Sequence, residues 1–239
     1  MTWGQISWPG FASSRPHTKG DVELPTLQHR LVTARGLRRR DARALEHALG
    51  DNRGWLEPWE ATTPFIRPGQ LSARSSIRGL LAAAKAQTAL PLVLEVDHEV
   101  VGQLNVSQIT YGSLSSATLG YWVVEKVAGQ GITPVAVALA TDYLFFEKGL
   151  HRMEVCIRPE NTASLRVVEK LGFRYEGLRR RFIHIDGKWA DHFCFALVVE
   201  EVPRGILARY EAGQVPPGVA TIPEIDWVKA RNPLPLPPR

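Results

Sequence analysis

A strand-like segment, a turn with two glycines and a helix-like segment follow one another in the middle of the chain. The strand-like segment, 117–124, is rich in aromatic and β-branched residues, and the helix-like segment covers 132–148. The turn between them is Lys126-Val127-Ala128-Gly129-Gln130-Gly131. Such an arrangement directs backbone N–H groups and the positive end of a helix toward one point, which suits a pyrophosphate. Ordinary connecting turns share this spacing, so the turn alone does not identify a ligand.

The composition is that of an ordinary globular protein. The chain has 239 residues, of which 44% are hydrophobic and 22% are charged, enough for one sizeable core or two small ones. No apolar run approaches the ~20 residues of a membrane-spanning helix, and residues 1–10 lack the features of a secretory signal. The two cysteines form no CxxC pair and the histidines do not cluster. We therefore expect a cytoplasmic protein with no metal, no disulfide framework and no membrane partner.

The net charge of +5 includes two arginine triplets, at 38–40 and 179–181. Each triplet fits a solvated surface, and each also fits attraction to an anionic partner such as a phosphorylated cofactor or ribosomal RNA. The sequence contains no signature of an RNA-binding module, which disfavours sequence-specific recognition of nucleic acid. It does not decide between a monomer and a homodimer.

Periodicity and turn signals divide the chain into three parts. Residues 1–27 predict an irregular arm, 28–202 a folded domain, and 203–239 a Pro-rich, partly mobile extension with a helix at 204–211. In the domain we expect strands at 29–35, 92–96, 100–109, 117–124, 152–158, 174–185 and 190–200, helices at 38–49, 70–88, 132–148 and 162–171, and a loop at 51–69. This order predicts an α+β fold with a mixed, mostly antiparallel seven-stranded sheet and helices on both faces.

Short polar and glycine-containing segments mark several boundaries. Turns at 97–99 and 186–188 predict hairpins between the strands that flank them. Asn161 fits an N-cap, and Gly172 fits the position just past the end of the same helix.

Several separated motifs carry a family resemblance. In chain order they are Asn52-Arg53, Leu56-x-Pro58-Trp59, Leu119-Gly120-Tyr121-Trp122, Lys126-x-x-Gly129-x-Gly131, His151-Arg152, Asn161-x-x-Ser164, Leu171-Gly172-Phe173 and Asp186-Gly187-Lys188-Trp189-x-Asp191-His192. Together they resemble the GNAT superfamily of acetyl-CoA-dependent N-acetyltransferases. Within it they resemble the RimJ/RimL branch of ribosomal-protein N-terminal acetyltransferases, RimJ more closely. The resemblance covers residues 28–200, and Lys126 departs from the Gln or Arg that is usual there.

The resemblance implies a GNAT fold for the domain, an acyltransferase activity and acetyl-CoA as cosubstrate. Main-chain groups of Val123 and Val124 would pair with the pantetheine arm of CoA. The turn and the first helical residues would hold the pyrophosphate, with Lys126, Ala128, Gly129, Gln130, Gly131, Ile132 and Thr133 as the binding residues. Asn161 would contact the pantetheine region and also cap its helix. Arg158 and Lys170 could meet the 3′-phosphate of CoA, but they also fit an exposed surface.

The catalytic groups of the family are largely replaced in this chain. Many GNAT enzymes protonate the leaving thiolate with a tyrosine, and Val168 stands at that position. The resemblance to RimL-type enzymes makes Ser164 a cofactor-binding residue, whose hydroxyl could reach the sulfur of CoA, and the candidate acid, although Ser164 also fits a helix surface. The glutamates that serve as bases in RimL-type and RimI-type relatives map onto Ile183 and Cys156. Cys156 lies in an apolar run, so it fits a buried side chain that packs in the core better than an acyl-carrying nucleophile.

Three titratable residues remain as candidates for the general base. They are His184, Glu99 and Asp191, among which histidine has the best intrinsic pKa for the task. A chain of waters to backbone carbonyls would serve equally, and Asp191-His192 also fits a structural tie between the last two strands. We leave the base unassigned.

The chemistry favours a protein N-terminus as acceptor. An α-amine has a pKa of about 7.7–8.0 and is partly neutral at pH 7, whereas a lysine side chain near 10.4 needs stronger activation. The expected function is therefore direct transfer, in a ternary complex, from acetyl-CoA to the N-terminus of a ribosomal protein. Two alternatives stay open. One is acetylation of a small amine such as an aminoglycoside or polyamine, and the other is a catalytically silent GNAT protein that senses acyl-CoA or binds the ribosome.

Overall fold

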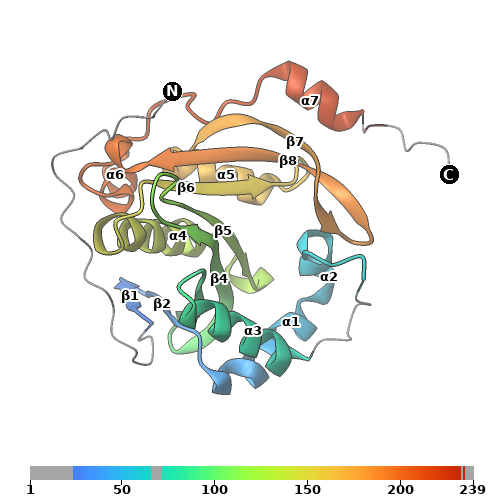
Figure 1. Cartoon of the computed structure of the whole chain (residues 1–239), viewed down its shortest axis with the longest axis vertical. Coiled ribbons are helices and arrows are strands. Elements are labelled where there is room, and N and C mark those ends of the chain that lie inside the picture. The colour runs from blue at the N-terminus through green and yellow to red at the C-terminus, as the bar shows by residue number, and fades with distance from the viewer. Residues whose placement is uncertain (1–23, 66–71, 233, 235–239) are drawn as a thin grey trace, which may run out of the picture.

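The computed structural model describes residues 24–65, 72–232 and 234, which form one eight-stranded sheet with helices on both faces (Figure 1). The strands are β1 (Thr26–His29), β2 (Val32–Gly36), β3 (Leu90–Val96), β4 (Glu99–Thr110), β5 (Ser116–Val123), β6 (Arg152–Ile157), β7 (Arg174–Ile185) and β8 (Lys188–Val198). They are ordered β1-β2-β3-β4-β5-β6-β8-β7. Every pair of neighbours is antiparallel except β5 and β6, which run parallel. The α+β class and the mixed sheet are confirmed.

The sheet has one strand more than the seven predicted. The single strand expected at 29–35 is in fact two, β1 and β2, which turn back at Arg30 and Leu31. Arg30 has a left-handed φ of 52°, and the turn was missed because no Gly, Asn or Asp marks it. β1 also takes residues 26 and 27 from the expected irregular arm, of which 1–23 lie outside the described residues.

Strand β3 explains why helices cover both faces of the sheet. Successive side chains of a strand point to opposite faces, and Leu92 and Val93 are both fully buried. Leu92 belongs to the large cluster beneath α4 (Ile132–Asp142). Val93 packs on the other face with Leu45 of α1 (Ala42–Asp51) and Ile77 of α3 (Ala73–Lys85). Figure 1 shows α1 and α3 grouped away from α4.

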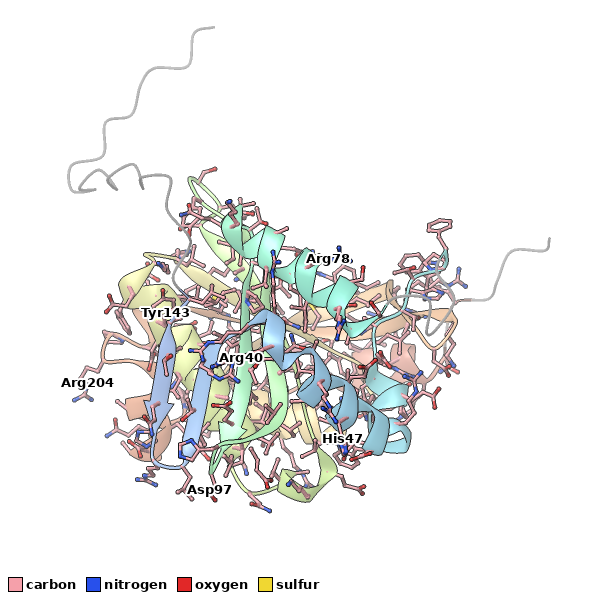
Figure 2. The ribbon with its side chains drawn as sticks, turned by 90° about the horizontal axis from the view of Figure 1, so that it is seen from below. Arg40, His47, Arg78, Asp97, Tyr143 and Arg204 are labelled. Carbon is pink, nitrogen blue, oxygen red and sulfur yellow. The ribbon has the colours of Figure 1, made fainter. Side chains whose placement is uncertain are left out.

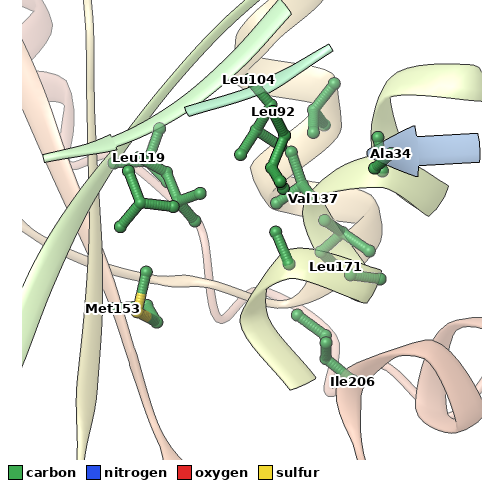
Figure 3. Close-up of a cluster of buried hydrophobic side chains, with 14 of the residues drawn as sticks. Ala34, Leu92, Leu104, Leu119, Val137, Met153, Leu171 and Ile206 are labelled. Atoms are coloured by element: carbon green, nitrogen blue, oxygen red, sulfur yellow. The ribbon is translucent and has the colours of Figure 1, made fainter. Parts of the chain in front are cut away.

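Helix α4 is buried on almost every side because it is apolar around its whole circumference. Figure 3 shows Val137 of α4 among Leu92, Leu104 and Leu119 of the sheet. The helix expected at 132–148 continues beyond Asp142 as a π-helical turn, η4 (Tyr143–Glu147). The packed strands and α4 therefore fix the position of the turn that precedes the helix.

The remaining helices refine the predicted boundaries. Helix α5 (Thr162–Leu171) has the predicted limits, and α3 is shorter than the predicted 70–88. The expected loop at 51–69 is partly helical, with α2 (Arg53–Leu56) and η2 (Glu57–Trp59). Short 3₁₀ turns occur at η1 (Arg39–Asp41), η3 (Glu125–Val127) and η5 (Val199–Glu201). No helix of the described residues is long and apolar enough to cross a membrane.

The C-terminal extension packs on the domain as far as its second helix. The expected helix at 204–211 is α6 (Ile206–Glu211), whose first N–H group donates to Asp142 at 2.7 Å. A further helix, α7 (Glu224–Arg231), was not predicted. The Tyr175 hydroxyl donates to Asp226 at 2.9 Å, and the Trp227 ring meets Phe193 edge-on at 4.8 Å. Packed aromatic residues thus hold the extension to the domain as far as α7. The proline-rich end, for which mobility was expected, falls almost entirely on residues 235–239, which lie outside the described part.

Candidate active site

Strand β5 is paired on both sides along only half of its length. Its pairing with β4 runs on to Val123, but its pairing with β6 covers only Ser116 to Leu119. We call 116–119 the paired half of β5 and 120–123 the open half. The Val124 N–H donates to the Val101 carbonyl at 2.8 Å. Because hydrogen-bonded pairs alternate along an antiparallel ladder, the main-chain groups of Tyr121 and Val123 point away from β4 and toward the opening.

Helix α2 is attached to the open half of β5. The Trp55 indole N–H donates to the Val123 carbonyl oxygen at 3.1 Å. The Asn52 side chain accepts the Glu125 N–H at 2.9 Å and donates to the Ala48 carbonyl at 2.9 Å. The Asn52 motif singled out in the sequence therefore fixes the end of β5 where the turn begins.

The residues of η2, which follow α2, reach the end of β6 on the other side of the opening. Arg158, just past β6, donates to the Pro58 carbonyl at 2.7 Å and lies 5.7 Å from the centre of the Trp59 ring. Its Nε is 3.2 Å from a Glu160 carboxylate oxygen. The segment 52–59 therefore bridges the two diverging strands. The Arg158 guanidinium is engaged in this bridge, whereas Lys170 stays an exposed candidate for the 3′-phosphate of CoA.

The turn before α4 has the backbone that an anion site requires. Gly129 and Gly131 have left-handed φ values of 78° and 83°, and a Cβ on either would meet no atom within 4 Å. The N–H groups of Ala128 and Gln130 donate within the turn, but those of Gly129 and Gly131 find no acceptor in the described part of the chain. The first N–H groups of α4 also lack intrahelical acceptors. An open space bordered by free N–H groups and a helix N-terminus fits a pyrophosphate.

Two residues expected to bind the cofactor already have partners in the protein. Lys126 Nζ lies 2.6 Å from the exposed Glu99 carboxylate, and this contact lowers the pKa of Glu99. The Val124 N–H is bound to Val101, and its carbonyl accepts the Val127 N–H at 3.2 Å. Of the valine pair, Val123 and not Val124 therefore directs its main chain into the opening.

The first turn of α5 brings two hydroxyl groups together. Asn161 accepts the Ser164 N–H at 3.0 Å, so its predicted role as the N-cap is confirmed. The Tyr121 hydroxyl oxygen is buried and has no hydrogen-bond partner among the described residues. Burial raises the pKa of Tyr121, and the nearby Ser164 hydroxyl acts in the opposite direction. In the sequence, Tyr121 was noted only as part of a family motif. Its position beside Ser164 depends on where β5 and β6 separate, and no local sequence pattern marks that point.

The other two base candidates lie beyond the end of β6, toward the tip of the β7–β8 hairpin. His184 is buried, and its Nδ1 lies 2.7 Å from the Thr62 hydroxyl. Asp191 accepts the Arg181 N–H at 2.7 Å and lies 2.7 Å from Arg180 Nε. Asp191 thus ties β8 to β7, the structural role that the sequence left open for it. None of the described contacts joins His184 or Asp191 to Ser164.

His192 is a residue whose chemistry the sequence analysis missed. Its side chain is 2% exposed, and its Nδ1 lies 3.0 Å from the Ala190 carbonyl. A carbonyl can only accept, so Nδ1 carries the proton and Nε2 keeps a lone pair. Burial lowers the pKa of His192, which keeps the ring neutral at pH 7. Phe193, its neighbour in β8, lies in the cluster under α4, so His192 projects from the opposite face of the sheet.

The cysteines face each other instead of the opening. Cys156 of β6 and Cys194 of β8 are register partners with their Sγ atoms 3.1 Å apart. This contact and burial raise the pKa of Cys156, which does not suit an acyl-carrying nucleophile. Among the described residues, no group of three or more His, Cys, Asp or Glu could hold a metal ion.

Comparison with known proteins identifies relatives of the chain. The family profile described as "Acetyltransferase (GNAT) domain" matches residues 32–174. The structure of Mycobacterium smegmatis RimJ in complex with CoA-disulfide is 37% identical and superposes with a TM-score of 0.74, covering 81% of this chain and 95% of RimJ.

Two curated relatives are also similar. The probable N-acetyltransferase YjcK of Bacillus subtilis is 40% identical over 102 residues, which are 43% of this chain and 56% of that protein. The [ribosomal protein uS5]-alanine N-acetyltransferase of Escherichia coli is 29% identical over 164 residues, which are 68% of this chain and 84% of that enzyme. The predicted resemblance to RimJ-type proteins is confirmed.

Proposed function

The chain belongs to the GNAT acetyltransferase family, and we propose that it transfers the acetyl group of acetyl-CoA to the α-amine of a ribosomal-protein N-terminus. The observation that carries this proposal is the open half of β5, which lies between the glycine turn and the Asn161-to-Ser164 turn of α5. The opening beside β5 thereby offers main-chain partners for an extended arm, a candidate anion site at one end and hydroxyl groups near it. Those are the needs of acetyl-CoA, the acyl donor of this family.

The donor would be held mainly by backbone groups. The Gly129 and Gly131 N–H groups and the start of α4 would bind the pyrophosphate. The pantetheine arm would run along the open half as an added strand, pairing with Tyr121 and Val123. Trp55 already occupies the Val123 carbonyl, so the Val123 N–H is the group we expect to pair.

Ser164 would serve as the general acid. The amine would attack the thioester carbonyl, the new C–N bond would replace the C–S bond, and the departing CoA thiolate would take a proton from the Ser164 hydroxyl. Ser164 would regain a proton from water, into which the base releases the proton that the amine lost. Tyr121, whose buried hydroxyl lacks another partner, would act behind Ser164 as a positioning residue that orients this hydroxyl. The position of Ser164 beside the buried Tyr121 hydroxyl favours this role over that of an ordinary helix-surface serine.

His192 would accept the proton that the amine loses, directly or through water. It is neutral, holds its lone pair on Nε2 and projects from the face of the sheet opposite α4. His184 stays a candidate, but its Nδ1 is engaged by Thr62 near the hairpin tip. A base with a lowered pKa suffices for an α-amine, because part of that amine is neutral at pH 7 before it binds.

The acceptor assignment draws on the relatives and on charge. The E. coli relative is named for the alanine of ribosomal protein uS5, and the M. smegmatis structure is of a RimJ protein. The chain as a whole carries a net charge of +5. A small polycationic acceptor would be repelled by a basic protein, which favours a peptide in the cytoplasm over an aminoglycoside or polyamine.

Mass spectrometry of acetylated peptides tests the proposal. Peptides that begin with Ala or Ser and contain an internal lysine would be incubated with acetyl-CoA and the full chain, beside a panel of polyamines and aminoglycosides. We expect one acetyl group on the α-amine and none on the lysine. Acetylation of the small amines alone would contradict the acceptor, and no product with any acceptor would support the catalytically silent alternative.

A further inference from the structure

Five cationic side chains gather between η1 and α3. They line two adjoining hollows that share Arg39 and Arg78, and the full set is Arg39, Arg40, Arg74, Arg78 and Lys85. All five are exposed. Figure 2 presents this face, with Arg40 labelled near η1 and Arg78 on α3. We call these five residues the arginine groove.

The periodicity of α3 aligns its three cations. Arg74, Arg78 and Lys85 are spaced by four and seven residues, so at ~3.6 residues per turn they fall within about 40° of one another. At ~1.5 Å per residue their stripe is about 16 Å long. Helix α3 contains no acidic residue. Nothing on the helix itself therefore neutralises the stripe.

The arginines of the groove differ from those of the β6–β8 region in having no ionic partner. Within the part of the chain that the structure describes, no ion pair involves any groove residue. In contrast, Arg152 pairs with Glu154 and Glu176 in the β6–β8 region. The one acid of η1, Asp41, is already bound by Arg35 at 2.8 Å and is 5% exposed. Unpaired surface arginines repel one another, and an anionic partner would remove that cost.

We propose that the arginine groove binds the phosphate backbone of double-helical RNA without reading its base sequence. Four of the five cations are arginines, whose planar forks match phosphate oxygens. The other lining residues are small or aliphatic: Leu24, Ile77, Gly79, Leu81, Ala82 and Ala84. Among the described residues no aromatic ring lines the groove, so this lining offers no stacking platform for single-stranded bases, whereas duplex RNA is recognised mainly through its backbone and shape.

The choice of RNA as the partner rests on the proposed function, since ribosomal proteins are assembled on folded RNA. The position of the groove supports it. The cluster under α1 and α3 also packs against Trp122 in the open half of β5, and α1 leads into α2, whose Trp55 binds Val123. RNA held in the groove would therefore lie on the helical layer that reaches the candidate acetylation site.

Fluorescence anisotropy with a labelled RNA hairpin of about 20 base pairs tests this inference. The full chain would be titrated without acetyl-CoA or acceptor at several KCl concentrations. One variant combines Arg39→Gln, Arg74→Gln and Arg78→Gln. Its matched control combines Lys148→Gln, Arg166→Gln and Arg204→Gln, which remove the same charge from exposed positions elsewhere.

We expect the groove variant to bind the hairpin at least tenfold more weakly, with a slope of log K against log[KCl] that is shallower by about 2.7, since three cations are removed. The control should lose less than about threefold. An equal loss in both variants, tighter binding to duplex DNA, or equal competition by polyglutamate of the same charge would each overturn the proposal. So would a wild-type chain that does not bind the hairpin.

Acetylation of a free peptide separates this inference from the proposed function. The groove variant should acetylate the peptide with wild-type kcat/KM, because RNA is absent from that assay. Loss of peptide acetylation in the groove variant with intact RNA binding would assign the groove to the acceptor site and overturn the inference. RNA binding by a wild-type chain that acetylates no peptide would contradict the proposed function and leave the groove as an RNA site.

Discussion

The two halves of strand β5 have opposite roles in one continuous strand. In the paired half, β4 and β6 flank residues 116–119, and Leu119 is 2% exposed in the main core. In the open half, Tyr121 and Val123 keep their pairing with β4 but direct main-chain groups into the space that β6 leaves. The paired half gives the sheet stability, whereas the open half gives up one row of strand hydrogen bonds and leaves the edge that we propose binds acetyl-CoA.

The strongest test of the paired half is Leu119→Ala. Removing a fully buried leucine from a packed core should lower the free energy of unfolding by about 2–5 kcal/mol. Val123→Ala, in the open half, is the control and should cost less than about 1.5 kcal/mol because Val123 is only half-buried. Urea unfolding followed by circular dichroism measures both. Equal losses would mean that the two halves do not differ in their contribution to the core.

Binding at the glycine turn that follows the open half is tested by Gly129→Glu. The carboxylate would occupy the open space beside the free N–H groups, and we expect the Kd for acetyl-CoA to rise at least 100-fold, about 2.7 kcal/mol. Gly112→Glu is the matched control, since Gly112 also has a positive φ, 75°, and open space around its Cβ position. Isothermal titration calorimetry would compare them. Near-normal binding by the Gly129 variant would place the phosphates elsewhere.

The hydroxyl pair at the open half is tested by Ser164→Ala. Loss of a general acid should lower kcat about 30- to 100-fold while leaving the Kd for acetyl-CoA unchanged. Thr162→Ala, on the same turn of α5, should have little effect. Tyr121→Phe should lower kcat by a smaller factor of about 3–10, because it removes the hydroxyl beside Ser164. It should not lower stability, because no other described residue bonds this buried hydroxyl. A Ser164→Ala enzyme with normal kcat would exclude Ser164 as the acid.

The smallest effect concerns His192, at the end of β6. Its folded pKa is lowered below 6.5 by burial, so the unfolded chain binds more protons in the range between the two values. The free energy of unfolding should therefore rise with pH up to about 6.5 and then level off, by at most ~1.4 kcal/mol per pH unit. His192→Gln should reduce the rise of the free energy of unfolding with pH relative to the wild type, measured by urea unfolding at pH 5–7.5. An unchanged slope would indicate that His192 is not buried as a neutral ring.

Local patterns in the sequence predicted most of the helices and strands, but not the point at which β5 and β6 separate. The limits of α5 followed from the Asn161 cap and Gly172, and the two hairpins followed from the turns predicted at 97–99 and 186–188, although each turn has two residues and not three. The β1–β2 turn at Arg30 was missed because it lacks a turn residue. α7 was missed since its docking depends on distant partners such as Phe193.

Only part of the candidate site was predicted, because some of its residues carry local sequence signals and others depend on contacts between distant elements. The glycine turn and Asn161 carry local signals, because left-handed φ values and helix caps select particular residues. The contact between Tyr121 and Ser164 and the neutral His192 depend on where β6 leaves β5, and no sequence spacing encodes that point.

Amide hydrogen exchange with and without CoA tests the difference between the halves of β5 most directly. Bound CoA should slow exchange at the N–H groups of Tyr121 and Val123, and at Gly129 and Gly131 of the turn. Leu119, whose main chain already faces β6, should exchange at the same rate in both states. Protection that appears at the turn but not at Tyr121 and Val123, or that is equal along the whole strand, would contradict the assignment of the open half as the edge that receives acetyl-CoA.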